Sequence, residues 1–238
     1  MKRSILKISA ALILLFGLLS SCGIMCEEGS GHMIKNKRKL VEFSSISLRG
    51  AAKVYITQGN TQSLEIEADD NIIDLIETYV KGNKLIISNK NFCFRNATIK
   101  IYITLKYIDA IALAGSGDII GKNTILTDHL DISVSGSGNV KLNLKADKIE
   151  SHITGSGTIY LVGKTKSNKS KISGSGDLRA FELETSDTEI TIGGSGSARI
   201  NVTEKLDAYI YGSGDIRYSG KPEDVNQTVR GSGSVRKR

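Results

Sequence analysis

The sequence has almost no proline and few residues of the kinds that bind metals or catalyse reactions. Among 238 residues there are one proline, Pro222, three cysteines and three histidines. Proline cannot donate a backbone hydrogen bond, so its scarcity suits a chain whose backbone donors lie in continuous β-ladders. No Cys-x-x-Cys motif and no Cys/His cluster of metal-binding spacing occurs in the sequence. We therefore expect no metal and no cofactor.

No catalytic arrangement is visible around the histidines, which are His32, His129 and His152. Their order along the chain relative to serine and aspartate supports no Ser-His-Asp triad. Gly163-Lys164-Thr165 resembles the end of a phosphate-binding loop, but Thr158 stands where the first glycine of that loop is required. The sequence thus predicts that the protein is not an enzyme.

What the sequence has instead is a repeat. The tripeptide Gly-Ser-Gly occurs seven times in the last 124 residues, and successive copies start 18 to 21 residues apart. A period near 20 with a fixed signature indicates a repeat architecture, in which each unit buries its apolar face against its neighbours. The copies start at Gly115, Gly136, Gly155, Gly174, Gly194, Gly212 and Gly231.

Two aliphatic columns flank the tripeptide in every copy. One lies two positions before the first glycine, from Leu113 to Val229, and the other lies four positions after it, from Ile119 to Val235. The positions beside them are nearly all polar, and this period of two is typical of strands. We therefore predict an all-β solenoid whose coils have about 19–20 residues. All seven copies of both columns should line one buried core.

A degenerate eighth copy lies upstream, where Gly50-Ala51-Ala52 stands in place of Gly-Ser-Gly. It predicts a solenoid of about eight coils over residues 40–238, interrupted after the first coil by an insertion at residues 58–106. We expect the insertion to cap the first coil, because an open strand edge invites pairing with other chains. A ligand-binding role is the alternative.

The insertion has its own expected elements. Residues 64–68 and 98–105 alternate in polarity like strands. A short helix capped by Asp69 or Asp70 should run to about Glu77, with three isoleucines on one face, and Gly82-Asn83 should form a hairpin turn.

The N-terminus has the pattern of a bacterial lipoprotein leader. Residues 1–21 are a predicted signal peptide, with basic residues before an apolar run too short to span a bilayer comfortably. Leu19-Ser20-Ser21-Cys22 resembles a lipobox, in which the cysteine is acylated. Ordinary secretory cleavage and an uncut membrane anchor are the alternatives. Several acyl chains on Cys22 would anchor the protein stably, and we expect the polar residues 22–39 to form the tether.

Removal of this leader would leave a small positive charge. The leader holds three basic and no acidic residues, so 29 basic and 25 acidic residues remain, a net charge of +4. So mild an excess does not predict nucleic-acid binding.

With Cys22 acylated, Cys26 and Cys93 remain. They could form a disulfide in an oxidising compartment, or Cys93 could be a small buried thiol.

Several of these features occur together in one known family. They are the lipobox, the tract Lys53-Val-Tyr-Ile-Thr-Gln-Gly59 followed by Leu64-Glu-Ile-Glu-Ala68, the hairpin Lys81-Gly-Asn-Lys-Leu-Ile-Ile87 and the repeated Ser/Thr-Gly-Ser-Gly-Asp-Ile units. In this combination, over about residues 40–236, the chain resembles the head GIN domain family of putative autotransporter adhesins, exported proteins of Gram-negative bacteria. The resemblance implies a right-handed parallel β-helix-like fold and a location in the cell envelope. It brings no catalytic residues.

One outward column holds the candidate binding residues. Five positions after the first glycine of successive copies stand Ile120 and then Lys141, Tyr160, Arg179, Arg199, Arg217 and Arg236, with Tyr55 in the degenerate coil. Stacked coils would place these side chains in a row about 4.8 Å apart, where like charges repel unless countered. The row suits carboxylated or sulfated glycans, because arginine binds such anions through two parallel hydrogen bonds. The alternative is a solvated face on which Asp177 and Asp215 neutralise part of the charge.

The sequence therefore favours an outer-membrane lipoprotein, anchored through Cys22, that binds an anionic polysaccharide or another surface ligand. A structural envelope protein that self-associates is the alternative. A polysaccharide-active enzyme is a third hypothesis, because parallel β-helices host lyases that use Ca²⁺. The aspartates that could hold Ca²⁺, Asp118, Asp177 and Asp215, lie in non-adjacent coils. The membrane leaflet and the direction of the repeated serine stay open.

Overall fold

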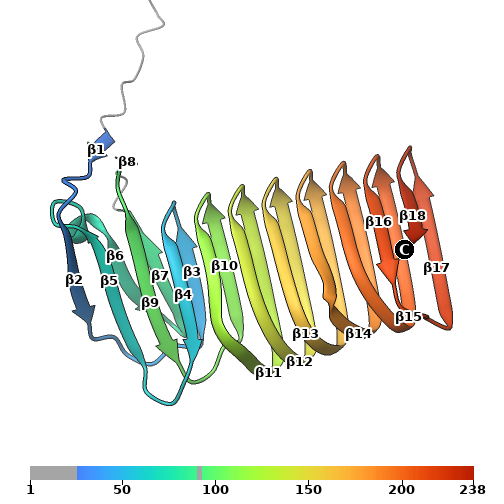
Figure 1. Ribbon diagram of the computed structural model, residues 1–238, viewed down its shortest axis with the longest axis horizontal. Helices are drawn as coiled ribbons and strands as arrows, with labels where there is room; N and C mark the ends of the chain where they lie inside the picture. Colours follow the sequence, from blue (N-terminus) through green and yellow to red (C-terminus); the bar gives the residue numbers. More distant parts are fainter. Residues whose placement is uncertain (1–25, 90–92) are drawn as a thin grey trace, which may run out of the picture.

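The chain forms a parallel β-solenoid, which Figure 1 shows as a flattened rod of stacked coils. This computed structural model describes residues 26–89 and 93–238. β10 (Ala110–Gly115) leads into five long strands that each make one coil and pair in parallel with the next, namely β11 (Asp118–Gly136), β12 (Asn139–Gly155), β13 (Thr158–Gly174), β14 (Asp177–Gly194) and β15 (Ser197–Gly212). The solenoid has about seven turns, so the predicted fold class is confirmed and the predicted coil number is approximate.

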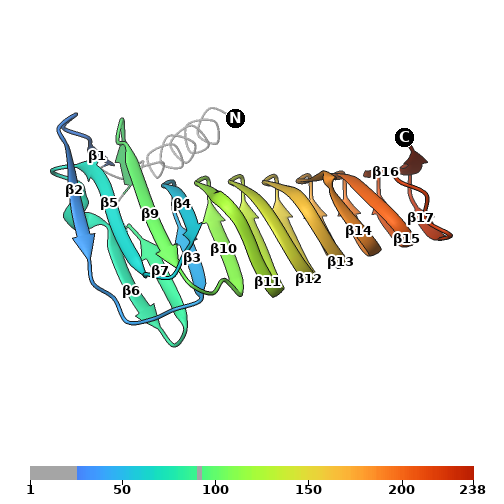
Figure 2. The same ribbon diagram turned by 60° about the horizontal axis from the view of Figure 1, so that its bottom comes forward.

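Every Gly-Ser-Gly lies at a corner, where the chain turns sharply from one wall of a coil into the other (Figure 2). The first glycine has a φ between 110° and 144° at all eight stacked corners, including Gly50 of the degenerate copy. Residues with a side chain rarely adopt that conformation. The second glycine points inward, since a Cβ on Gly157 would lie 2.6 Å from both the Gly138 carbonyl oxygen and Val134 Cγ1. The serine between them is exposed in every copy.

The two aliphatic columns line the interior, as predicted, in all copies but the last. From Leu48 to Ile210 and from Val54 to Ile216, their members are at most 2% exposed. Each fully buried aliphatic side chain of this kind stabilises the fold by about 1.5–3 kcal/mol. In the last copy Val229 is 40% exposed and Val235 is partly buried. The prediction of seven buried copies is therefore wrong at this end, because a residue in the last described coil has a neighbouring coil on one side only.

That last coil is built from short strands. β16 (Asp215–Ser219) pairs with β15, β18 (Ser234–Lys237) pairs with β16, and β17 (Asp224–Arg230) pairs with β15 on the other wall. All three pairings are parallel, so the repeat geometry continues to the end of the described chain.

The insertion covers the first coil on both walls, as predicted. The first coil consists of β3 (Ser45–Arg49) and β4 (Lys53–Gln58). In parallel pairing, β7 (Lys84–Ser88) covers β3 and β9 (Ile99–Leu105) covers β4. Antiparallel strands follow outside them, β6 (Glu77–Lys81) beside β7 and β5 (Ser63–Asp69) beside β9. The first coil thus has no open strand edge.

The predicted hairpin is present and the predicted helix is not. Gly82 has a φ of 62° in the turn between β6 and β7. In place of a helix from Asp69 or Asp70 to Glu77 there is one 3₁₀ turn, η1 (Ile73–Leu75), after which the chain is extended. β-Branched isoleucines favour extended structure, and one turn is enough to bury Ile72, Ile73 and Ile76. The Arg38 guanidinium donates hydrogen bonds to the Ile73 and Ile76 carbonyl oxygens at 2.9 and 2.6 Å.

The stretch predicted to be a tether is part of the fold from residue 26 onward. β2 (Met33–Arg38) pairs antiparallel with β5 and forms the edge of the sheet, and β1 (Cys26–Glu28) pairs with β8 (Cys93–Arg95). An edge strand exposed to water on both faces needs few apolar residues, so its polar composition resembled that of a linker. The tether prediction is wrong for these residues.

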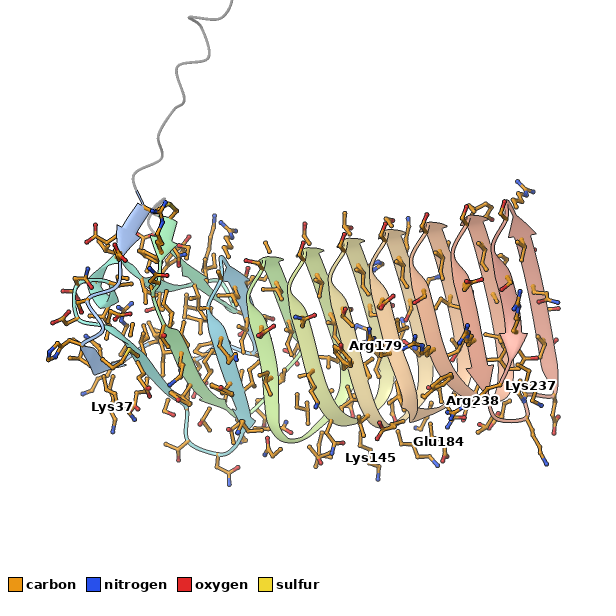
Figure 3. All side chains as sticks on the ribbon, turned by 45° about the horizontal axis from the view of Figure 1, so that its top comes forward. Lys37, Lys145, Arg179, Glu184, Lys237 and Arg238 are labelled. Atoms are coloured by element: carbon orange, nitrogen blue, oxygen red, sulfur yellow. A yellow bond between two sulfur atoms is a disulfide. The ribbon has the colours of Figure 1, made fainter. Side chains whose placement is uncertain are left out.

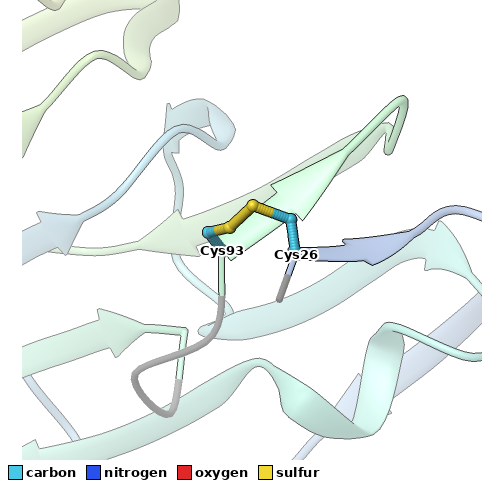
Figure 4. Close-up of a disulfide and its surroundings, with 2 residues drawn as sticks. All are labelled: Cys26 and Cys93. Carbon is cyan, nitrogen blue, oxygen red and sulfur yellow. A yellow bond between two sulfur atoms is a disulfide. The ribbon is translucent and has the colours of Figure 1, made fainter. Parts of the chain in front are cut away.

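Cys26 and Cys93 form a disulfide, with Cα atoms 4.6 Å apart (Figure 4). Of the two alternatives for Cys93, the disulfide is therefore correct, and it closes a loop of 67 residues.

The predicted signal peptide and the predicted acylation site, Cys22, lie outside the described residues. Within residues 26–89 and 93–238, no helix has the length and apolar character needed to cross a membrane.

Candidate ligand-binding site

Each coil has two long walls that meet at the Gly-Ser-Gly corner. We call the outward side chains of the segment after the corner the row wall, and those of the segment before it the paired wall. The corners stack in register, for example Gly136 with Gly155 and Gly155 with Gly174. Side chains at equal offsets from the corner are therefore neighbours in adjacent coils, about 4.8 Å apart.

The structure brings the predicted binding residues together on the row wall. Successive in-register neighbours are Lys141, Tyr160, Arg179, Arg199, Arg217 and Arg236. Tyr160 and Arg199 are half-buried, and the other four are exposed. Toward the cap the row continues through Ile120 to Tyr55, whose ring stacks on Tyr102 with centroids 5.2 Å apart. Four arginines thus occupy consecutive coils at the C-terminal end of the row.

In the described structure only the first of these arginines forms an ion pair with a carboxylate, and the Asp177 charge also acts on Arg199. Arg179 Nη2 lies 3.1 Å from Asp177 Oδ2, and the Arg179 guanidinium lies 5.1 Å from the centroid of the Tyr160 ring. Arg199, Arg217 and Arg236 have no carboxylate oxygen within 4.0 Å in the part of the chain that the structure describes. The expected partner of Arg217 was Asp215, which instead accepts a hydrogen bond from Ser234 Oγ at 2.6 Å.

The aspartates of the row wall form a ladder between coils. Asp118 accepts a hydrogen bond from Asn139 at 2.9 Å, and Asp177 accepts one from Ser197 at 2.6 Å. Burial raises the pKa of the Asp177 carboxyl, but the hydrogen bonds from Ser197 and Arg179 outweigh burial and hold the pKa below its ordinary value. Each of these aspartates is thus linked to a neutral side chain of the next coil, and Asp177 is also paired with Arg179. Among the described residues, no three His, Cys, Asp or Glu side chains are grouped in a way that could hold a metal ion.

The paired wall differs, because three of its lysines lie beside carboxylates, whereas the exposed Lys171 forms no ion pair in the described structure. The ion pairs are Lys148–Glu150 at 2.5 Å, Lys169–Glu189 at 2.9 Å and Lys205–Asp207 at 3.3 Å. The hydrogen bond from Lys148 is the main cause that lowers the pKa of Glu150. His152, another outward residue of this wall, is exposed as the sequence predicted.

One residue of the basic surface was missed as a binding candidate. Arg238, next to Lys237, places its guanidinium 5.1 Å from the centroid of the Phe181 ring. Figure 3 shows Arg179, Lys237 and Arg238 in the C-terminal half of the rod. Arg238 and Phe181 both stand seven positions after the first glycine of their repeat. That shared offset is the signal that could have placed them on the same wall as the row.

The fold agrees with what is found in known proteins. The family described as "Putative auto-transporter adhesin, head GIN domain" matches residues 42–222. The chain belongs to this family. The description implies a protein that is exported or exposed at a surface, since adhesion takes place outside the cell. No curated protein matches the chain.

Solved structures of related bacterial proteins have the same fold. A putative adhesin from Bacteroides fragilis is 31% identical with a TM-score of 0.83, over 89% of this chain and 99% of that one. A putative lipid binding protein from Parabacteroides distasonis is 26% identical with a TM-score of 0.74, over 90% and 100%. A putative adhesin from Parabacteroides merdae is 25% identical with a TM-score of 0.72, over 89% and 98%. The solenoid and its cap are therefore shared among these relatives.

Proposed function

We propose that this head GIN domain protein is a lipid-anchored binding module of the cell envelope and that its row wall binds anionic glycans. The observation that carries the proposal is the run of Arg199, Arg217 and Arg236 in adjacent coils, none of which has a carboxylate oxygen within 4.0 Å in the described structure. Like charges at this spacing repel one another. A polyanion that lies across the coils would relieve the repulsion and offer each guanidinium a carboxylate or sulfate to bind.

The test compares two variants that lose equal positive charge from opposite walls. The row variant is Arg199→Ser, Arg217→Ser and Arg236→Ser, and the control is Lys148→Ser, Lys169→Ser and Lys205→Ser. Retention on immobilised heparin should weaken at least about tenfold in the row variant, and far less in the control. Retention of the wild type should also fall as salt rises, because exposed charges are screened. Equal losses in the two variants would mean that only net charge matters.

The membrane anchor is the second part of the proposal. Cys22 would carry the lipid, and the disulfide begins only four residues later at Cys26. A Cys22→Ser protein should take up no labelled palmitate and should leave the membrane fraction or stay leader-bound. Palmitate incorporation in that variant would contradict the assignment. Protease treatment of whole cells would then show whether an outer-membrane location includes exposure at the surface.

Self-association is the second candidate function, and the open end of the solenoid favours it. β17 and β18 each have a pairing partner on one side only in the described structure, and Val225 and Val229 of β17 are 38% and 40% exposed. Free strand edges with apolar side chains can pair with a second chain. Sedimentation velocity should then show a concentration-dependent dimer that Val229→Lys abolishes. A monomer at all concentrations would remove this candidate.

A further inference from the structure

A concave surface lies at the lower bend of the coils, opposite the Gly-Ser-Gly corners. It is a hollow of about 810 Å³ that crosses the bends of β11, β12 and β13 and ends at the loop between β9 and β10. Lys145 lines it, and Figure 3 shows that side chain at the lower margin of the rod. Its volume lies in the range of pockets that hold small molecules.

The charged groups that line the hollow are balanced in number, since three lysines (Lys145, Lys164 and Lys166) stand with three aspartates (Asp109, Asp128 and Asp147). Lys166 Nζ lies 2.8 Å from Asp147 Oδ1, and Lys164 Nζ lies 2.6 Å from Glu184 Oε1. The Asp128 carboxylate also lines the hollow and has no hydrogen-bond or ion-pair partner among the described residues. The hollow therefore offers donors and acceptors on a lining that carries no net charge, and Lys145 forms no ion pair in the described structure. Such a lining favours an uncharged ligand with many hydroxyl groups.

Exposed apolar side chains stand in the same hollow. Tyr107, in the loop between β9 and β10, is 62% exposed, and Leu126 is 60% exposed. Lys106 Nζ lies over the Tyr107 ring, 5.0 Å from its centroid, and Lys106 does not line the hollow. The Lys106 ammonium group occupies one face of the Tyr107 ring, and a ligand would stack on the other face. The flat C–H face of a pyranose packs on an aromatic ring of this kind.

We propose that this hollow is a binding site for a neutral oligosaccharide, with Tyr107 as the stacking platform. Asp128 accepts hydrogen bonds from the sugar hydroxyls, and Lys145 donates to them. The site is separate from the row wall, so the protein holds a glycan chain at two places of different chemistry. The row wall binds the charged groups, and the hollow binds an uncharged segment.

The test uses saturation-transfer NMR with four neutral probes, namely maltotetraose, cellotetraose, mannotetraose and chitotetraose. At least one should bind the full mature protein, with an affinity that does not change between low and high salt. Tyr107→Ala should weaken that binding about tenfold, and Asp128→Asn should weaken it as well. Tyr211→Ala, which removes an exposed tyrosine of the paired wall, is the matched control and should bind like the wild type.

Three results would overturn the proposal. They are no binding of any of the four probes, binding that Tyr107→Ala leaves intact, and binding that weakens with salt in the way that heparin retention does. Because Tyr107 is exposed, its variant should melt at the wild-type temperature and keep wild-type heparin retention. Those two readouts separate a failure of this proposal from a failure of the polyanion proposal.

Discussion

The two walls of the solenoid share the same corners and the same core, yet they differ in how many of their cations form ion pairs. On the paired wall, lysines and carboxylates lie side by side in three successive ion pairs. On the row wall, one arginine is paired and the next three are not. This difference is the basis of our proposal that Arg199, Arg217 and Arg236 bind a ligand.

The glycine corner belongs to both walls, so breaking it should have the largest effect. A side chain on Gly157 would meet the Gly138 carbonyl oxygen and the buried Val134 Cγ1, and the Gly138 backbone cannot move without shifting a coil. Gly157→Val should lower the free energy of unfolding by more than about 3 kcal/mol. Ser156→Val, one residue away on the exposed side of the corner, should change it by less than about 0.5 kcal/mol. Thermal melting measures both, and similar melting temperatures would contradict the corner geometry.

Neutralising the carboxylates of the paired wall should give that wall the unpaired cations that now distinguish the row wall. The variant is Glu150→Gln, Glu189→Gln and Asp207→Asn. It frees Lys148, Lys169 and Lys205, which lie in β12, β13 and β15 of one wall, so this wall should become a second polyanion surface, and heparin affinity should rise about three- to tenfold. An affinity equal to that of the wild type would mean that uncountered cations on one wall are not enough for binding.

Lowering the pH should also release a lysine of the paired wall from its carboxylate. The Lys148 hydrogen bond holds the pKa of Glu150 below its ordinary value of 4.5. Because this pKa is lowered in the folded state, the ion pair contributes stability above pH 4.5 and loses it as pH falls through the folded-state pKa. Below that pH Lys148 is freed, while the arginines stay charged.

Retention on a sulfated matrix, which keeps its charge in acid, should therefore rise on acidification. The rise should be smaller in the variant that already lacks the three carboxylates. An equal rise in both proteins would assign the effect to other acidic groups.

The smallest expected effect concerns the aromatic neighbour of the paired arginine. Tyr160→Leu removes the ring that lies 5.1 Å from the Arg179 guanidinium. We expect a loss of at most about 1 kcal/mol in stability and about a twofold change in heparin affinity. Tyr211→Leu removes the corresponding ring beside Arg230 on the paired wall, 5.9 Å away, and should leave heparin affinity unchanged. Titration calorimetry measures the affinities of both variants.

Much of the fold was predictable because the repeat imposes it locally. The offsets from Gly-Ser-Gly predicted the buried columns from Leu48 to Ile210 and the in-register row from Lys141 to Arg236. Both follow from a period of two and from corners that only glycine can form. The hairpin at Gly82 was predictable for the same reason, since its turn depends on residues adjacent in sequence.

What could not be predicted depends on contacts between distant segments. β2 has polar residues on both faces, and only its pairing with β5 shows that it is a strand. The disulfide needed Cys26 and Cys93 to be side by side, which β1 and β8 bring about across 67 residues. The partner of Asp215 was also beyond the sequence, because Ser234 and Arg217 both lie within its reach and geometry decides between them.

The most direct test of the account is to locate the bound polyanion by chemical footprinting. Arginine- and lysine-selective reagents, read out by mass spectrometry with and without a sulfated oligosaccharide, report which side chains the ligand covers. The account predicts protection of Arg199, Arg217 and Arg236, and unchanged reactivity of Lys148, Lys169 and Lys205. Protection spread evenly over both walls, or confined to the paired wall, would contradict it.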